Sequence, residues 1–315
     1  MPQPTKQGKK PVKPPFPTNA SFEQKHREQN DKLVNYLTTK RGRKAEYQQL
    51  VGELQEGSAL SHYATNCTAR IEFAKSTVRK LIAMRNNDKE NENVRDYAFM
   101  TLTPRFAALP LSVAGTYDWS QLQIWATEKL KGLSYFGIVE AAFFSNIAIS
   151  IAKEPTVSWH IHIIVWGAGR KELRDIISRI NAEELALIED KKPAHFRMMK
   201  DRKDLACTTR YMLKSVQTDY RVFTPKGKKK DGTKDWDQKK GIIKPGNAIK
   251  MHRLFRGATI EDLCIYGGEG GTLFRRVTKS CTKRILEVEK ERQRQLSEAS
   301  KGISLKTAKE RLANL

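Results

Sequence analysis

Two hydrophobic periods alternate along the middle of the chain. Apolar, β-prone runs predict four strands, at about residues 97–104, 135–144, 156–166 and 195–199. Helical spacing of apolar positions predicts three helices, at about residues 119–130, 170–189 and 203–217. The β-α-β-β-α-β-α order predicts an α+β fold with a central antiparallel sheet and helices packed on one face, related to ferredoxin-like folds.

The pattern changes toward both ends of the chain. Residues 1–20 are rich in Pro and Lys and poor in apolar side chains. We expect a disordered basic tail there, because burial could not offset the entropy lost on ordering. Charged residues with scattered apolar positions predict a helical extension at 21–95 and a charged helical tail at 276–315. The compact domain is therefore expected at 96–275, with a basic, Gly-rich loop or hairpin at 222–250.

The net charge of the chain indicates which class of partner it binds. The 315 residues carry a formal net charge of +23, which favours a polyanionic partner, because Lys and Arg gain affinity by releasing counterions from phosphates. Charge alone does not separate DNA, RNA and an anionic membrane. The longest mostly apolar stretch, Gly137 to Ala152, contains Glu140 and three other polar residues. It is too short to span a bilayer, so we expect no membrane partner.

The cysteines and the N-terminus indicate the compartment. The four cysteines lie far apart, which disfavours both a disulfide framework and a zinc ribbon. The basic N-terminus has no apolar block after it and does not look like a secretory signal. We therefore expect a cytoplasmic protein with free thiols.

The sharpest chemical motif is His160-Ile161-His162, inside the third predicted strand. Alternation along a strand places both imidazoles on one face and Ile161 on the other. Two neutral imidazoles so placed can share one divalent ion. Alternatively, they are ordinary histidines of a sheet.

A second motif pairs Tyr211 with Lys214 on the last predicted helix. A spacing of three places the phenol and the ammonium on one helix face. The cation would then neutralise a phosphate or favour the phenolate, which makes the tyrosine a better nucleophile. The alternative is a half-buried tyrosine beside a solvated lysine.

Together these motifs resemble those of the HUH endonucleases, the family of rolling-circle replication initiators and related relaxases and transposases. His160-Ile161-His162 resembles the His-hydrophobic-His strand of that family. Phe99-Met-Thr-Leu-Thr-Pro104 is similar to its upstream strand motif, and Tyr211-Met-Leu-Lys214 is similar to its Tyr-x-x-Lys motif. The three occur in the order of the family and cover about residues 95–220.

The resemblance implies a set of site residues. His160 and His162 would hold Mn²⁺ or Mg²⁺, and Tyr211 would attack the scissile phosphate while Lys214 steadies it. The family also supplies a third metal ligand, which is often acidic. The best match is Glu140, because a carboxylate among apolar strand residues needs a partner, with Glu154 as the second choice.

The resemblance also implies one tyrosine nucleophile. The position four residues after Tyr211, where several initiators have a second tyrosine, is Ser215. Tyr220 is half a turn out of register on the predicted helix, and we expect it outside the site. His195 is expected at the surface of its strand, and the three remaining histidines, His26, His62 and His252, indicate no function.

The implied activity is the initiation of rolling-circle DNA replication in a bacterial cytoplasm. The enzyme would nick single-stranded or hairpin origin DNA, leaving a 5′-phosphotyrosine and a 3′-hydroxyl for a host polymerase. The chain has no Walker A motif, so we expect no ATP use and a host helicase as partner. A relaxase or transposase is the alternative within the family. A non-catalytic DNA- or RNA-binding protein is the alternative from another class, with stacking aromatics at Tyr97, Phe99, Phe143 and Phe144.

Overall fold

The computed structural model describes residues 16–301 except for seven short gaps, at 42–44, 56–62, 93–94, 150–152, 189, 217 and 224–236. Residues 1–15 of the expected basic tail, His62, much of the basic loop and the chain beyond residue 301 lie outside the described residues. The expectation of disorder was wrong for residues 16–20, because Phe16 is buried and α1 begins at Asn19.

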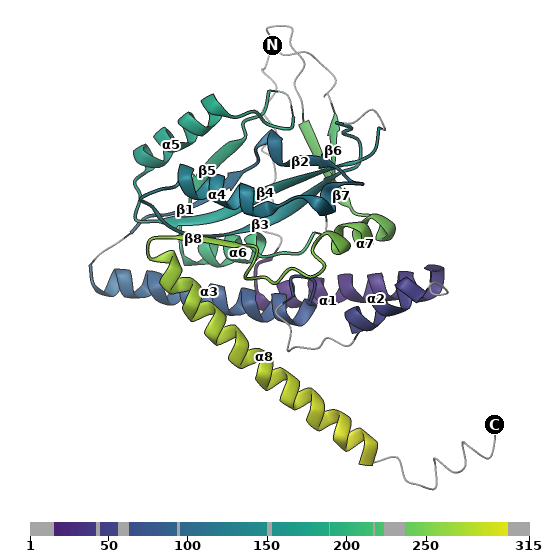
Figure 1. Cartoon of the computed structure of the whole chain (residues 1–315). Coiled ribbons are helices and arrows are strands. Elements are labelled where there is room, and N and C mark those ends of the chain that lie inside the picture. Colours follow the sequence, from purple (N-terminus) through teal and green to yellow (C-terminus); the bar gives the residue numbers. More distant parts are fainter. Residues whose placement is uncertain are drawn as a thin grey trace, which may run out of the picture.

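The strands form one sheet with the order β5-β1-β4-β3-β6-β7, to which β2 is added along β4 and β8 along β3 (Figure 1). Their bounds are β1 Tyr97–Leu102, β2 Ala108–Pro110, β3 Ser134–Phe144, β4 Thr156–Trp166, β5 Ala194–Met198, β6 Thr218–Phe223, β7 Asp237–Ile242 and β8 Cys264–Gly267. All pairs are antiparallel except β3 with β6. The predicted central antiparallel sheet is therefore confirmed for β5, β1, β4 and β3, whereas β6 makes the whole sheet mixed. Between β3 and β6 the chain passes through β4, α5, β5 and α6, which is long enough for the crossover that a parallel neighbour requires.

Helices cover the sheet on both faces. They are α1 Asn19–Tyr36, α2 Ala45–Gln55, α3 Cys67–Glu90, α4 Trp119–Lys129, α5 Arg170–Glu183, α6 Arg202–Met212, α7 Pro245–Leu254 and α8 Gly270–Lys301. Phe73 of α3 packs against Phe136 on one face, and Trp119 of α4 packs against Trp159 on the other. Every residue of β1 and β4 is accordingly buried. The expectation that helices lie on one face was wrong.

The four predicted strands and three predicted helices are confirmed in order and type, with two helices shorter than expected. The helix predicted at 170–189 ends at Glu183, and the helix predicted at 203–217 ends at Met212. The sequence reading missed the short strands β2 and β8 and the helix α7. Residues 276–301 of the charged C-terminal tail are part of α8, a single helix that starts at Gly270 and packs along α3 before projecting from the sheet (Figure 1).

Gly137 allows β3 to lie unusually close to β4. A Cβ at this position would lie only 2.6 Å from the carbonyl oxygen of His162 and 2.9 Å from the side chain of Ile163. No other residue fits without moving one of the two strands, which are the strands that carry the candidate metal ligands.

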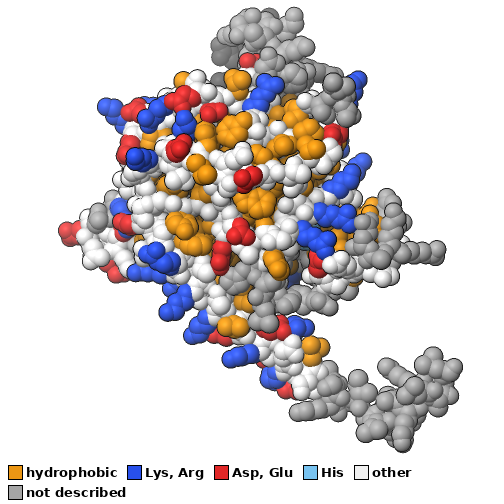
Figure 2. Space-filling model, in the orientation of Figure 1, with side chains coloured by type: hydrophobic (Ala, Val, Ile, Leu, Met, Phe, Trp, Pro, Cys, Tyr) orange, Lys and Arg blue, Asp and Glu red, His pale blue; other side chains and the backbone are white. Residues whose placement is uncertain are grey.

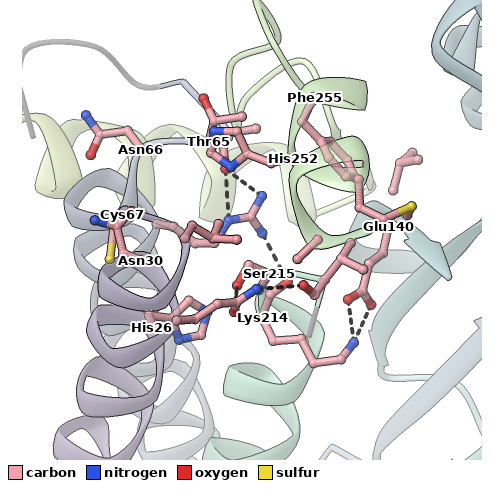
Figure 3. Close-up of a pocket in the computed structure, with 18 residues that line it drawn as sticks. His26, Asn30, Thr65, Asn66, Cys67, Glu140, Lys214, Ser215, His252 and Phe255 are labelled. Atoms are coloured by element: carbon pink, nitrogen blue, oxygen red, sulfur yellow. Dashed lines mark hydrogen bonds and ion pairs between the residues drawn. The ribbon is translucent and has the colours of Figure 1, made fainter. Parts of the chain in front are cut away.

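A small cavity of about 60 Å³ lies between α1, the start of α3, α7 and β3 (Figure 3). This volume suffices for a few water molecules but not for a nucleotide. His26 and His252 line it, and burial lowers the pKa of each to about 4. The two histidines are therefore neutral groups of the interior, rather than the uninformative polar positions that the sequence indicated.

Charged side chains are spread over the face of the molecule in Figure 2. On the face in Figure 2, Lys and Arg side chains surround the sheet and follow α8, while hydrophobic side chains gather between them. No helix among the described residues has the length and apolar character needed to cross a membrane.

Candidate active site

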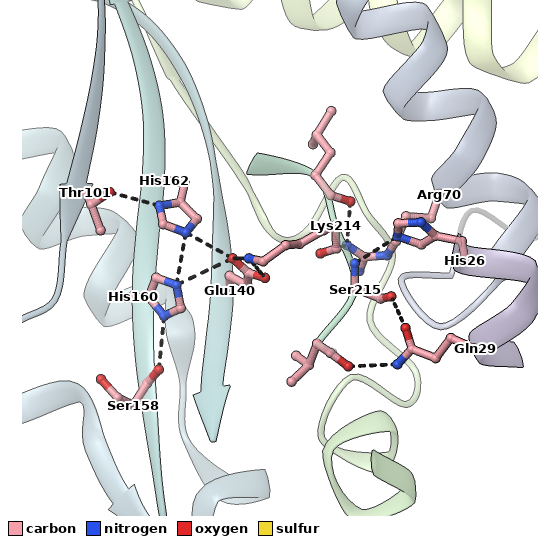
Figure 4. A network of polar contacts seen from close by, with 12 residues as sticks. His26, Gln29, Arg70, Thr101, Glu140, Ser158, His160, His162, Lys214 and Ser215 are labelled. Carbon is pink, nitrogen blue, oxygen red and sulfur yellow. Dashed lines mark hydrogen bonds and ion pairs between the residues drawn. The ribbon is translucent and has the colours of Figure 1, made fainter. Parts of the chain in front are cut away.

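The register of β3 against β4 assembles a buried three-residue cluster. His160 and His162 lie on one face of β4, and Glu140 of β3 is the direct cross-strand partner of His160. All three residues are at most 6% exposed, and one ligand atom from each lies within 4.8 Å of the others (Figure 4). The predicted grouping of Glu140 with the two histidines is confirmed. Glu154 lies outside it and accepts hydrogen bonds from Ser112.

The spacing of the three ligand atoms fits a single divalent ion. The two histidine Nε2 atoms are 3.3 Å apart, and Glu140 Oε2 lies 3.1 Å from Nε2 of His162 and 3.5 Å from that of His160. Ligands that are each about 2.1 Å from one metal lie about 3.0–3.4 Å apart in octahedral or tetrahedral geometry. The cluster can therefore hold a metal with little rearrangement.

The outer ring nitrogens of both histidines have partners that orient them. His160 Nδ1 lies 3.1 Å from the carbonyl oxygen of Ser158, so Nδ1 carries the hydrogen and Nε2 presents its lone pair to the cluster. His162 Nδ1 lies 3.0 Å from the hydroxyl of Thr101. Burial lowers the pKa of His162 to about 3, and a neutral imidazole is the form that binds metal.

Lys214 pairs with the carboxylate of the cluster. Its Nζ donates to both oxygens of Glu140 and lies 2.6 Å from Oε2 (Figures 3 and 4). Burial opposes ionisation of Glu140, but Lys214 and the two histidines outweigh it and hold the pKa of this carboxyl well below its ordinary value. α6 ends at Met212, so Lys214 lies beyond the helix rather than within it as predicted. The predicted pairing with Tyr211 is confirmed, since the N–H of Lys214 bonds to the carbonyl of Tyr211 at 3.4 Å and its ammonium lies over the Tyr211 ring. Lys214 reaches the cluster from the segment after the helix.

Tyr211 lies in the last turn of α6, next to the cluster. Its ring centroid is 5.4 Å from that of His162, and Phe99 packs edge-on against it. The ammonium of Lys214 lies 4.4 Å from the same ring. Tyr211 and both histidines line one cleft of about 480 Å³, which is the size of a pocket for a nucleotide-sized ligand.

Tyr220 also lies in this cleft, so the expectation that it lies outside the site was wrong. The register argument assumed one continuous helix, whereas Tyr220 lies on β6, opposite Phe144 in the parallel pairing with β3. Burial together with Tyr211 and Glu140 raises the pKa of Tyr220. Lys240 of β7 approaches both phenol rings, at 5.8 Å from Tyr211 and 5.7 Å from Tyr220.

His195 lies at the rim of the cleft. Its side chain is exposed on β5, as expected, and faces the same space as His160 and His162. Partial desolvation in the cleft and the neighbouring His160 lower its pKa. Sequence reasoning missed Lys240 and the place of Tyr220, since both depend on how β6 and β7 join the sheet.

Comparison with protein-family models, with curated proteins and with solved structures finds no match to this chain. The functional argument therefore depends on the geometry of the site and on the motifs of the sequence.

Proposed function

We propose that this protein is a metal-dependent tyrosine nuclease that nicks one strand of DNA. The observation that carries the proposal is the position of Tyr211, whose ring packs 5.4 Å from His162 of the buried Glu140–His160–His162 cluster. A nucleophile, a set of metal ligands and nearby lysines thus line or border one open cleft. This combination is what phosphoryl transfer to a tyrosine requires.

The residues divide the reaction between them. The oxygen of Tyr211 attacks the scissile phosphorus and loses its proton, while the bond from phosphorus to the 3′ oxygen breaks and that oxygen is protonated. The products are a 5′-phosphotyrosine and a free 3′-hydroxyl. A divalent ion bound to the cluster would polarise a non-bridging phosphate oxygen. Lys240 lies 5.8 Å from the Tyr211 ring centroid and would add positive charge for the negative phosphate.

The biological setting proposed here rests on the motifs and the charge. The net charge of +23 suits a nucleic acid, and the resemblance to HUH endonucleases favours a rolling-circle replication initiator. Such an enzyme would act on single-stranded or hairpin origin DNA, with a host helicase and polymerase. A relaxase or a transposase would use the same residues on another DNA.

One observation favours a second candidate function, that of a non-catalytic nucleic-acid-binding protein. Lys214 already neutralises Glu140 through both carboxylate oxygens. The cluster can therefore be satisfied as a buried ion pair in which the histidines are structural.

The experiment that separates the two candidates tests for a covalent adduct. The full chain and Tyr211→Phe are incubated with labelled single-stranded DNA from the parent replicon and Mn²⁺, and the products are run on a denaturing gel. We expect an adduct that EDTA and Tyr211→Phe abolish and that Tyr220→Phe retains. Peptide mapping of the adduct should identify Tyr211. Binding of DNA without any adduct would contradict the nuclease proposal and support the non-catalytic one.

A further inference from the structure

Side chains from two N-terminal helices, α1 and α3, hydrogen-bond to the segment that carries Lys214 (Figure 4). Gln29 of α1 accepts a hydrogen bond from the hydroxyl of Ser215 at 3.0 Å and donates to the carbonyl of Val216 at 2.8 Å. These residues are nearly 190 positions apart in the chain. The helical extension thus contacts the loop directly after the tyrosine helix.

His26 adds a bond to the backbone of the same loop. Its Nδ1 lies 2.8 Å from the carbonyl oxygen of Phe22, so Nδ1 carries the hydrogen. Its Nε2 therefore accepts, and it receives the backbone N–H of Ser215 at 3.1 Å. This bond fixes the amide that directly follows Lys214.

Arg70 of α3 is the third residue that binds the backbone of this loop. Its guanidinium is buried, and its hydrogen bonds within the described residues go to backbone carbonyls rather than to a carboxylate. Nη1 donates to the carbonyls of Leu213 and Lys214, each at 3.2 Å, while Nε and Nη2 donate to Ala64. Burial of a cation is costly unless its donors are used, and here they hold two successive carbonyls of the loop.

We infer that Gln29, His26 and Arg70 form a clamp that positions Lys214 between Glu140 and Tyr211. The three bind the backbone on both sides of Lys214, and its side chain then reaches Glu140 and lies 4.4 Å from the Tyr211 ring centroid. They act through Lys214 and are positioning residues. The inference rests on the proposed function and gives the N-terminal helices a part in it.

The clamp predicts two effects of opposite sign. Lys214 and a divalent ion both bind the carboxylate of Glu140. A Lys214 side chain that is held less firmly therefore competes less with the metal for that carboxylate. Loosening the clamp should therefore tighten metal binding. It should also slow the chemical step, because misplacing a group of the site lowers the rate of the bound complex. A loss of folded structure would instead weaken both.

The test compares Gln29→Ala with Gln24→Ala in the full chain. Gln29 is only half-buried, so the variant should fold. Gln24 is the matched control, because it is exposed on the same helix and its side-chain amide donates to Glu28 rather than to the loop. Mn²⁺ affinity is measured by titration calorimetry, and the rate of adduct formation is measured at saturating Mn²⁺ and DNA. For Gln29→Ala we expect Mn²⁺ affinity to rise several-fold and the rate to fall about 10-fold, as the loss of two hydrogen bonds allows. Gln24→Ala should match the wild type.

The outcomes separate this inference from the proposed function. If the wild type forms an adduct and Gln29→Ala behaves like Gln24→Ala, the clamp has no positioning role and the inference fails alone. If Gln29→Ala lowers metal affinity and rate together, its role is structural, which also overturns the inference. If the wild type forms no adduct, the proposed function is wrong. The positioning role of the clamp, which depends on that function, is then wrong as well.

Discussion

Replacing Lys214 with methionine removes the cation that compensates a buried carboxylate. The side chains of Lys214 and Glu140 are 9% and 6% exposed, so solvent screens their interaction little. Removing one partner of such a buried pair costs about 3–5 kcal/mol, mainly because the other charge stays buried without compensation. We expect Lys214→Met to lower the free energy of unfolding of the metal-free protein by about this amount at neutral pH.

Mn²⁺ should reverse most of this loss, because an ion on the Glu140–His160–His162 cluster replaces the missing charge. A ligand at 100 times its Kd stabilises a folded protein by about 2.7 kcal/mol. The assay is urea denaturation of the full chain with EDTA or with Mn²⁺. The control is the double variant Lys214→Met/Glu140→Gln, which buries no charge. It should be more stable than the single variant in EDTA and should respond little to Mn²⁺.

Two results would refute this reasoning. A loss below about 1 kcal/mol for Lys214→Met in EDTA would mean that the pair is effectively solvated, as surface pairs are. A full loss that Mn²⁺ leaves unchanged would mean that the cluster does not bind the ion, even though its atoms have the required spacing.

Three further predictions concern the strands and the buried histidines. Thr101→Val removes the hydroxyl that orients His162, and we expect Mn²⁺ affinity to fall about 10–100-fold by calorimetry. Gly137→Ala places a Cβ 2.6 Å from the carbonyl oxygen of His162 and should cost about 1–3 kcal/mol in urea denaturation. His26 has a pKa of about 4 against an ordinary 6.5, so between these values the unfolded chain binds a proton that the folded chain does not. The contribution of neutral His26 to the free energy of unfolding is therefore complete above pH 6.5 and is lost as the pH falls to 4, by about 1.4 kcal/mol per pH unit. His26→Gln should make the free energy of unfolding depend less steeply on pH in this range.

The strand part of the site was predictable from the sequence because its geometry is local. Alternation alone puts His160 and His162 on one face. Glu140 was predictable because a carboxylate within an apolar strand needs a partner. The cross-strand register that brings it opposite His160 was not, since periodicity does not fix strand order.

The tyrosine part of the site was predicted less well because long-range contacts shape it. Helical spacing continued the helix beyond Met212, whereas Arg70 binds the carbonyls of Leu213 and Lys214 in the segment where the helix has ended. Partners some 140 residues away leave no trace in local periodicity. Once the helix ends early, β6 can join the sheet and bring Tyr220 into the cleft.

Stability alone is a poor explanation for the polar cluster. A buried ion pair is often no more stabilising than apolar residues of similar volume, and two histidines add desolvation without compensating charge. On the opposite face of β4, Ile161 and Ile163 are fully buried in the apolar core. Apolar residues at 140, 160 and 162 would give an equally well-packed sheet. Perturbed ionisable groups that line an open cleft are typical of functional sites, and in this cleft they lie directly beside Tyr211. The arrangement therefore favours a functional role for the cluster, such as the proposed reaction at Tyr211, over the requirements of folding alone.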